Sequence, residues 1–431
     1  MPVKGMKRSI VMGITVLVVA VASGFSLAGI QAVNRNETQE GTQMDLDMVL
    51  LTNDYTVHDP ILITSNADFA SQGWPGNGTA GDPYLISGFS IAPSDNQNRS
   101  IFIQNTDVHF IVSHCFFYGF SYRFGLEMRN VTNGRANDVK CFDYDAIGAF
   151  DSSDIAIDGN NVSYIYLTSC ERVVIDGNVG NVSIDRSSDV SVMHNADGYI
   201  SIYESNRTVI RENTCLWLGS DHTKSKSYNC TIDGNIIVGA TYPLRVLSVR
   251  LIGLASSIFE NNTVLYADDA IDLESCESVV VANNTVFESD HAIGLSASYN
   301  ISMTWNVFNA QLGDEAAVYD QTGSNSFDYN WYSNYDGIDE NGDGIGDTPY
   351  NMSGVLDMHP LMRLRGFEIS PRNTTTSTTI TTTATSTATM DGEPIPPLVV
   401  TALVAGSISA IVAIITVRMM MKKQLAHQSS S

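Results

Sequence analysis

One pattern decides the fold, because it occurs twice at an interval of 18 residues, as Ile155-Ala-Ile157-Asp-Gly-Asn160 and as Val173-Val-Ile175-Asp-Gly-Asn178. The pattern is an apolar residue, any residue, a second apolar residue, two further residues and an asparagine. Later copies end at Asn195, Asn213, Asn235, Asn262, Asn284, Asn306 and Asn330. Two earlier units, residues 110–115 and one that ends at Val139, fit the pattern without its asparagine. The central region is therefore a repeat array.

This array predicts an all-β fold, a parallel β-helix. A period of about 20 residues with short apolar runs is typical of solenoids, and alternation within each run indicates a strand with one face inward. The consensus of leucine-rich repeats is absent, and a propeller blade needs about 40 residues. We interpret each asparagine as a turn residue that tolerates left-handed backbone and whose amide bonds to its copy one rung away. We expect about eleven rungs, ~4.8 Å apart, in a rod of about 50 Å with capped ends.

Two flanking segments carry a closer resemblance. The lead-in reads Ile61-Leu-Ile63-Thr-Ser-Asn66-Ala-Asp68-Phe69, then Gly73-Trp-Pro-Gly-Asn-Gly-Thr79 and Asp82-Pro83-Tyr84. The closing segment has Asn330-Trp331, Asp343-Gly-Ile-Gly-Asp347-Thr-Pro349-Tyr350 and Asp357-Met-His-Pro360-Leu361. Over residues 55–365 the chain resembles the pectin-lyase-like right-handed β-helices, and among them NosD-type and related carbohydrate-binding and sugar-hydrolase proteins of archaeal surfaces. The resemblance implies a single-stranded right-handed parallel β-helix; its motifs specify architecture rather than activity.

Both ends of the chain predict export and anchoring. Lys4, Lys7 and Arg8 precede an apolar run over residues 10–32, as in a secretory signal, although the run is also long enough for an uncleaved signal anchor. Residues 398–417 are apolar and uncharged, long enough to span a membrane as a helix. Basic residues follow at once, which places the short tail in the cytoplasm and the body outside the cell membrane.

The segment before the second apolar run is predicted to be a stalk. Residues 373–389 hold eleven Thr and two Ser, a composition that cannot bury a core. We therefore expect a signal segment (1–33), a linker (34–57), an N-terminal cap (58–100), β-helix repeats (101–330), a C-terminal cap (331–369), a stalk (370–397), a transmembrane helix (398–417) and a tail (418–431). Sequons for N-glycosylation agree with export, at Asn36, Asn77, Asn98, Asn130, Asn161, Asn181, Asn206, Asn229, Asn261, Asn283, Asn300, Asn351 and Asn373.

Charge excludes one class of partner. The chain has 23 Lys+Arg and 47 Asp+Glu, a net charge of −24, which argues against nucleic acid and favours cations or neutral partners. Residues 251–362 contain 18 Asp+Glu and no Lys or Arg. The excess acidity is therefore concentrated towards the C-terminal end of the array.

Cysteine and histidine predict neither a disulfide framework nor a copper site. Cys141 and Cys215 lie in one column four rungs apart, about 19 Å, which is beyond the reach of a disulfide. We expect mostly buried free thiols that act as small apolar side chains. Copper is not expected, because the sequence outside the membrane region has no His-x-His or Met-x-x-Met cluster.

The segment Asp339-Glu-Asn341-Gly-Asp343-Gly-Ile-Gly-Asp347, with Asp336 just upstream, predicts a structural calcium site. Alternate oxygen ligands and a glycine turn are typical of calcium loops. It is not an EF-hand, whose Glu at the twelfth position is Tyr350 here. The alternative is an acidic, glycine-rich turn.

A second constellation repeats in register. The pairs Asp268-Asp269, Asp290-His291 and Asp314-Glu315 lie 22 and 24 residues apart and would form an acidic ridge along three rungs. Carboxylates ~4.8 Å or ~9.6 Å apart span the separations that glycosidases use. The alternative is a polar turn column that binds a cation or faces solvent.

We interpret the whole as a membrane-anchored extracellular β-helix that binds glycans or envelope proteins without catalysis, stabilised by calcium. A glycoside hydrolase acting through the ridge is the first alternative, and more plausible than a polysaccharide lyase. The resemblance implies that a lyase has a basic residue beside its calcium, and none occurs in residues 251–362. A purely structural envelope rod is the second alternative.

Overall fold

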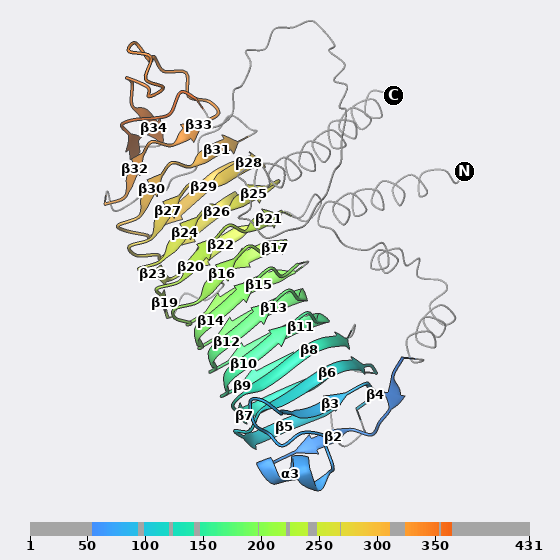
Figure 1. Ribbon diagram of the computed structural model, residues 1–431. Coiled ribbons are helices and arrows are strands. Elements are labelled where there is room, and N and C mark those ends of the chain that lie inside the picture. Colours follow the sequence, from blue (N-terminus) through green and yellow to red (C-terminus); the bar gives the residue numbers. More distant parts are fainter. Residues whose placement is uncertain are drawn as a thin grey trace, which may run out of the picture. The chain divides into compact units, whose positions relative to one another are not determined.

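The computed structural model describes residues 54–93, 99–119, 124–141, 147–196, 198–220, 225–239, 248–267, 269–310, 324–352 and 355–363. Residues 51–371 form one compact unit. In this unit the chain winds through short strands, almost all of them paired in parallel, and the described residues include a single short helix (Figure 1). The predicted all-β parallel β-helix is confirmed.

The strands stack in columns, because each turn of the chain lays its strands over those of the turn before. The first column contains β2 (Ile61–Ile63), β5 (Ile101–Thr106), β7 (Leu126–Val131), β9 (Ile147–Phe150), β11 (Asn161–Thr168), β13 (Val179–Asp185), β15 (Tyr199–Tyr203), β18 (Trp217–Gly219), β22 (Val249–Ile252), β26 (Asp269–Glu274) and β29 (His291–Ser296).

The second column contains β3 (Tyr84–Ser87), β6 (Phe110–Phe117), β8 (Gly134–Cys141), β10 (Ser153–Asp158), β12 (Glu171–Asp176), β14 (Ser188–Met193), β16 (Val209–Arg211), β20 (Thr231–Asp233), β24 (Ile258–Glu260), β27 (Val280–Ala282), β30 (Ser302–Thr304), β32 (Ser326–Asp328) and β35 (Val355–Asp357).

A third, shorter column runs along the later turns. It contains β17 (Thr214–Cys215), β21 (Ile236–Val238), β25 (Thr263–Leu265), β28 (Thr285–Ser289), β31 (Val307–Ala310) and β33 (Trp331–Tyr332). Near the N-terminal end, β1 (Thr56–Val57) and β4 (Phe89–Ile91) pair with each other, and β4 pairs with the end of β6. The short pair β19 (Ser227–Tyr228) and β23 (Leu254–Ala255) lies at another corner.

Alternation along each strand builds the core. In β12, Val173 and Ile175 are completely buried beneath the matching residues of the neighbouring turns, whereas Val174 between them is 41% exposed. The same inward positions repeat along the array and join into one apolar core. Burial of these side chains is the main term that stabilises each turn against its neighbours.

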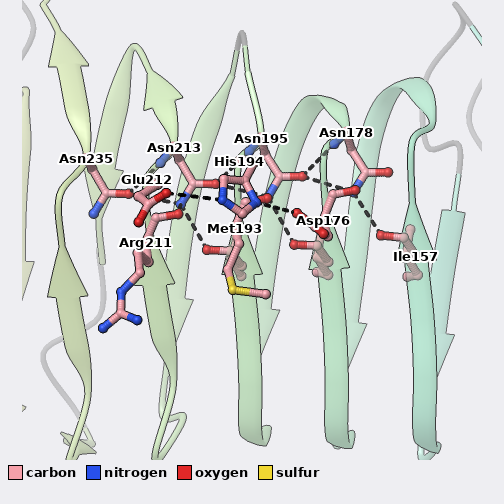
Figure 2. Close-up of polar contacts among 12 residues, drawn as sticks. Ile157, Asp176, Asn178, Met193, His194, Asn195, Arg211, Glu212, Asn213 and Asn235 are labelled. Carbon is pink, nitrogen blue, oxygen red and sulfur yellow. Dashed lines mark hydrogen bonds and ion pairs between the residues drawn. The ribbon is translucent and has the colours of Figure 1, made fainter. Parts of the chain in front are cut away.

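The repeated asparagines form a buried ladder along one corner of the solenoid (Figure 2). Asn178 donates from its backbone N–H and from Nδ2 to Oδ1 of Asn195, at 2.8 and 2.9 Å, and its Nδ2 also donates to the Ile157 carbonyl. Asn195 repeats this arrangement with Asn213, at 2.9 and 3.0 Å. The predicted bond between amides one rung apart is therefore present.

The solenoid has about 9 turns, fewer than the eleven rungs predicted. The two predicted units that lack the asparagine correspond to β6 and β8, which pair in the second column. One detail of the prediction was wrong: the left-handed conformation falls on the residue before each ladder asparagine, with φ of 64° at Gly177 and 54° at His194. The asparagine itself is occupied by hydrogen bonds to both neighbouring turns, so the residue that reverses the chain is the one before it.

Different devices close the two ends. The helix α3 (Asn66–Ser71) covers the N-terminal end (Figure 1). It buries Phe69, whose ring stacks on Tyr84 at 4.8 Å. At the other end β34 (Tyr350–Met352) turns back antiparallel to β35. There Asp357 is buried and accepts hydrogen bonds from the last ladder asparagine, Asn330.

All six cysteines are buried and free, as expected. Cys170 and Cys276 stand at a corner where other turns have serine. The backbone N–H of each donates to a serine hydroxyl of the next turn, Ser187 for Cys170 and Ser298 for Cys276. Their thiols donate to main-chain carbonyls of the preceding turn. Burial raises the pKa of Cys170 to about 11 and that of Cys276 to about 12, so both stay protonated.

The predicted signal segment, stalk, transmembrane helix and tail lie outside the described residues. Within the part of the chain that the structure describes, no helix is both long and apolar enough to span a membrane.

Candidate functional site

A cluster of charged side chains lies on the outer face of the first column, where β22 pairs with β26. Arg250 stands opposite Asp272 in the register. Its Nη2 donates to Glu274 Oε2 at 2.9 Å, and its Nε lies 3.6 Å from Asp272 Oδ2. That Nε is buried and has no hydrogen-bond partner among the described residues. We call these three residues the Arg250 cluster.

The surroundings of Asp272 are suited to holding a proton. Its side chain is 22% exposed, and burial raises the pKa of this carboxyl above its ordinary value. The Arg250 guanidinium opposes this rise in pKa, while the charges of Glu274 and Asp269 add to it. A carboxyl whose pKa is raised by burial and by like charges is a candidate acid or base.

Two glycines flank the Arg250 cluster in the same column. Gly219 precedes Arg250, and Gly294 follows Asp272. A Cβ on Gly294 would lie 2.9 Å from Asp272 Oδ1, and one on Gly219 would lie 1.9 Å from the Arg250 carbonyl oxygen. Gly219 therefore permits close stacking of the backbone, and Gly294 leaves room beside the carboxylate.

Part of the predicted acidic ridge lies next to this cluster. Asp269 and His291 are register partners on β26 and β29, and His291 Nδ1 lies 2.9 Å from Asp269 Oδ1. Both side chains are 43% exposed. Asp290 precedes His291, and its backbone N–H donates to the Ala267 carbonyl. The remaining three predicted ridge residues, Asp268, Asp314 and Glu315, lie outside the described residues.

The predicted calcium loop is closed by its own hydrogen bonds. Asp339 accepts from the backbone N–H groups of Gly342 (2.7 Å) and Gly344 (3.0 Å). Asn341 accepts from the N–H of Asp343, and Asp347 accepts from that of Glu340. Asn341, Asp343 and Asp347 are exposed, as is Asp336, the fifth predicted ligand, whereas Asp339 is partly buried.

Among the described residues no group of three or more His, Cys, Asp or Glu side chains is placed to hold a metal ion. In the loop the carboxylates turn towards backbone N–H groups instead of towards one another. A cation would therefore have to compete with hydrogen bonds already formed, or use the carboxylate oxygens that these bonds leave over.

Three histidines elsewhere, His114, His194 and His359, are paired with acids of adjacent turns. The His194 ring lies between Asp176 of the preceding turn, at 2.7 Å from Nδ1, and Glu212 of the following turn, at 3.2 Å from Nε2 (Figure 2). The hydrogen bond that His194 donates to Asp176 raises the pKa of His194, and Glu212 adds a smaller rise. When it is protonated, His194 can donate to both acids and so links three consecutive turns by hydrogen bonds.

Sequence reasoning missed Arg250, the only basic residue in the cluster. It lies one position before the stretch without Lys or Arg, so a count along the chain places it outside. The signal was its distance of 22 residues from Asp272, the same interval that separates Asp272 from Gly294. Because the turns stack, residues one turn apart in the sequence come into contact, whatever residue types lie between them.

Residues 128–337, which hold most of the repeat array, match the family model of NosD, described as a periplasmic copper-binding protein. The repeat region is NosD-like. The predicted resemblance to NosD-type β-helices is therefore confirmed for this region. No curated protein matches the chain.

Solved structures with a likeness to the chain share little sequence with it. The DFA-IIIase of Arthrobacter chlorophenolicus A6 without its lid has 10% identity and a TM-score of 0.38, over 55% of this chain and 72% of that one. The Dettilon tailspike protein has 12% identity and a TM-score of 0.36, over 65% and 59%. A PL6 family alginate lyase has 13% identity and a TM-score of 0.35, over 69% and 55%.

Proposed function

We propose that the NosD-like β-helix binds glycans without catalysis, through the outer face of its first column at the Arg250 cluster, and that it is displayed outside the cell on a single membrane anchor. The observation that carries the proposal is the buried Arg250 Nε, which has no hydrogen-bond partner within the described part of the chain and is held 3.6 Å from a half-buried carboxylate. A buried polar donor that lacks a partner costs free energy unless a ligand or water supplies the acceptor.

Sugar hydroxyls fit this arrangement of charges. Asp272 and Glu274 offer acceptors, and Arg250 offers donors, within one patch of about two turns. A hydroxyl group can donate to a carboxylate and accept from a guanidinium at the same time. The excess of carboxylates in this part of the chain favours a neutral ligand over an anionic one at this patch.

The test is binding to a glycan array, with and without calcium, followed by affinity measurements on the glycans that bind. Asp272→Asn and Arg250→Gln should each weaken binding about tenfold or more, the loss typical of one charged hydrogen bond. Arg172→Gln is the matched control, because Arg172 is an exposed arginine paired with Asp154 at the second column. Binding to no glycan would favour a purely structural rod.

A second candidate function, glycoside hydrolysis, is favoured by the raised pKa of Asp272 beside the pair of Asp269 and His291. Two carboxyl groups in different surroundings are the arrangement from which glycosidases draw an acid and a base or nucleophile. Release of reducing ends that disappears in Asp269→Asn and in Asp272→Asn would support this function. Binding without release of product supports the first.

Calcium remains part of the proposal as a structural ion of the loop that contains Asp339, Asp343 and Asp347. Its role would be to join the loop to the end of the solenoid. Copper is not part of it: the copper in the description of NosD belongs to that family, and the sequence offers no His-x-His cluster.

A further inference from the structure

A second cluster on the first column lies towards the N-terminal end and has the opposite charge. Glu127 of β7 is buried, and its carboxylate binds two arginines, Arg99 and Arg129. One arginine would neutralise the carboxylate, so, counting the described residues, the second leaves the group with a net charge of 2 − 1 = +1. In a chain of net charge −24 this cationic group is unusual.

The two guanidinium groups reach solvent and are held in place. The side chains of Arg99 and Arg129 are 32% and 47% exposed, although the carboxylate that they share is only 3% exposed. Arg99 lies over the ring of Phe102 at 4.4 Å, and Arg129 over that of Phe150 at 5.1 Å. Each guanidinium has five N–H donors and uses two on Glu127, so three on each are not used there.

Aromatic rings continue from the arginines along the same face. Phe150 and Phe124 meet edge to face at 5.4 Å, Phe124 meets Tyr166 at 5.8 Å, and Tyr166 stacks on Tyr164 at 4.4 Å. Two of these rings lie directly over Gly148, since a Cβ there would be 2.7 Å from Phe150 and 2.8 Å from Phe124. None of the four aromatic side chains is fully buried.

The register places the two groups side by side. Glu127 pairs with Gly148 and Arg129 with Phe150, so the arginines and the rings occupy consecutive turns of one sheet face, at β7, β9 and β11. A core needs neither arginines with donors to spare nor aromatic rings that face solvent. A ligand with an anionic group and an apolar ring face would use both.

We propose that Arg99, Arg129 and the rings of Phe124, Phe150 and Tyr166 form a subsite for an acidic sugar, one that carries a carboxylate or a sulfate. The arginines bind the anionic group, as planar guanidiniums do, and the sugar ring lies against the aromatic side chains. The subsite rests on the proposed glycan-binding function and extends it. Arg129 on β7 lies six turns from Arg250 on β22 in the first column, about 29 Å at ~4.8 Å per turn.

The test compares three probes on the purified full chain: a glucuronate-containing tetrasaccharide, a sulfated disaccharide and a neutral chitotetraose. We expect the wild type to bind at least one acidic probe more tightly than the neutral one, with an affinity that falls as salt is added. Whichever acidic probe binds identifies the anionic group. Arg129→Gln should weaken binding of that probe about tenfold or more and leave binding of the neutral probe unchanged.

Arg172→Gln controls for loss of a positive charge elsewhere and should change neither affinity. Since Arg129→Gln leaves Glu127 with one partner and can unfold the chain, Arg129→Lys is measured beside it; it keeps the charge, lacks the planar fork, and should show an intermediate loss. Equal binding of acidic and neutral probes by the wild type, or equal effects of Arg129→Lys and Arg172→Gln, would overturn the subsite while leaving glycan binding intact. Binding of no probe would overturn the glycan-binding proposal itself.

Discussion

Asp357 ends the asparagine ladder by standing where its next asparagine would be. Its Oδ2 accepts from the backbone N–H of Asn330 at 3.0 Å and from the Asn330 Nδ2 at 3.1 Å. Every ladder amide donates towards the C-terminal end, so the last one, Asn330, presents a positive edge there. A carboxylate is the natural terminus, because it accepts hydrogen bonds, has none to donate and carries the opposite charge.

Replacing Asp357 therefore tests how much the terminus contributes. Asp357→Leu removes the acceptor of Asn330 and also that of the Tyr332 hydroxyl, whose bond to Asp357 is 2.9 Å. We expect the free energy of unfolding, measured with urea, to fall by about 3–5 kcal/mol, since buried donors lose their partner. Asp357→Asn keeps an oxygen acceptor and should lose less. Equal losses would mean that packing, and not these hydrogen bonds, closes the end.

The bridge of His194 to Asp176 and Glu212 predicts a dependence of stability on pH. The pKa of His194 is raised in the folded state, so its contribution is complete below the unfolded pKa of about 6.5 and disappears as pH rises through the folded value. The side chains are half exposed, so solvent limits the effect to below about 1 kcal/mol. Urea unfolding at pH 5.5 and 8 should show a difference in the wild type that shrinks in His194→Gln. An unchanged difference would assign it to other groups.

The two glycines beside the Arg250 cluster should behave differently. Gly294→Ala places a Cβ against the movable Asp272 side chain, so ligand affinity should fall while the melting temperature stays within about 2 °C of the wild type. Gly219→Ala meets the Arg250 carbonyl, which is backbone and cannot move aside, and should cost several kcal/mol of stability. If Gly294→Ala bound the glycan normally, Asp272 would not contact it.

Calcium at the predicted loop can be tested by its removal. If the loop holds an ion, a chelator should lower the melting temperature of the wild type by several degrees and leave that of Asp343→Asn unaltered. Asp336→Asn, at the edge of the loop, should show an intermediate response. An identical melting curve with and without chelator would leave the loop held by its own hydrogen bonds alone.

The fold could be predicted from the sequence because turns of similar length place equivalent residues at a constant interval along the chain. The interval of 18 residues between Asn160 and Asn178 is the length of one turn, and it also relates His194 to both of its acidic partners. The left-handed residue was misplaced by one position, although the Asp-Gly-Asn string holds the glycine that suits it. Where turns differ in length, as between Arg99 and Glu127, 28 residues apart, no fixed interval finds the pair. Those contacts depend on where the extra residues of a longer turn are inserted between its strands, and the position of the insertion is known only from the structure.

The central claim is that the Arg250 cluster binds a glycan. The most direct measurement is calorimetric titration of the glycan that an array selects, with the wild type, Asp272→Asn and Arg172→Gln compared under one buffer. We predict an affinity about tenfold or more lower for Asp272→Asn, at an unchanged melting temperature, and no change for Arg172→Gln. Equal affinities in all three proteins would contradict the account.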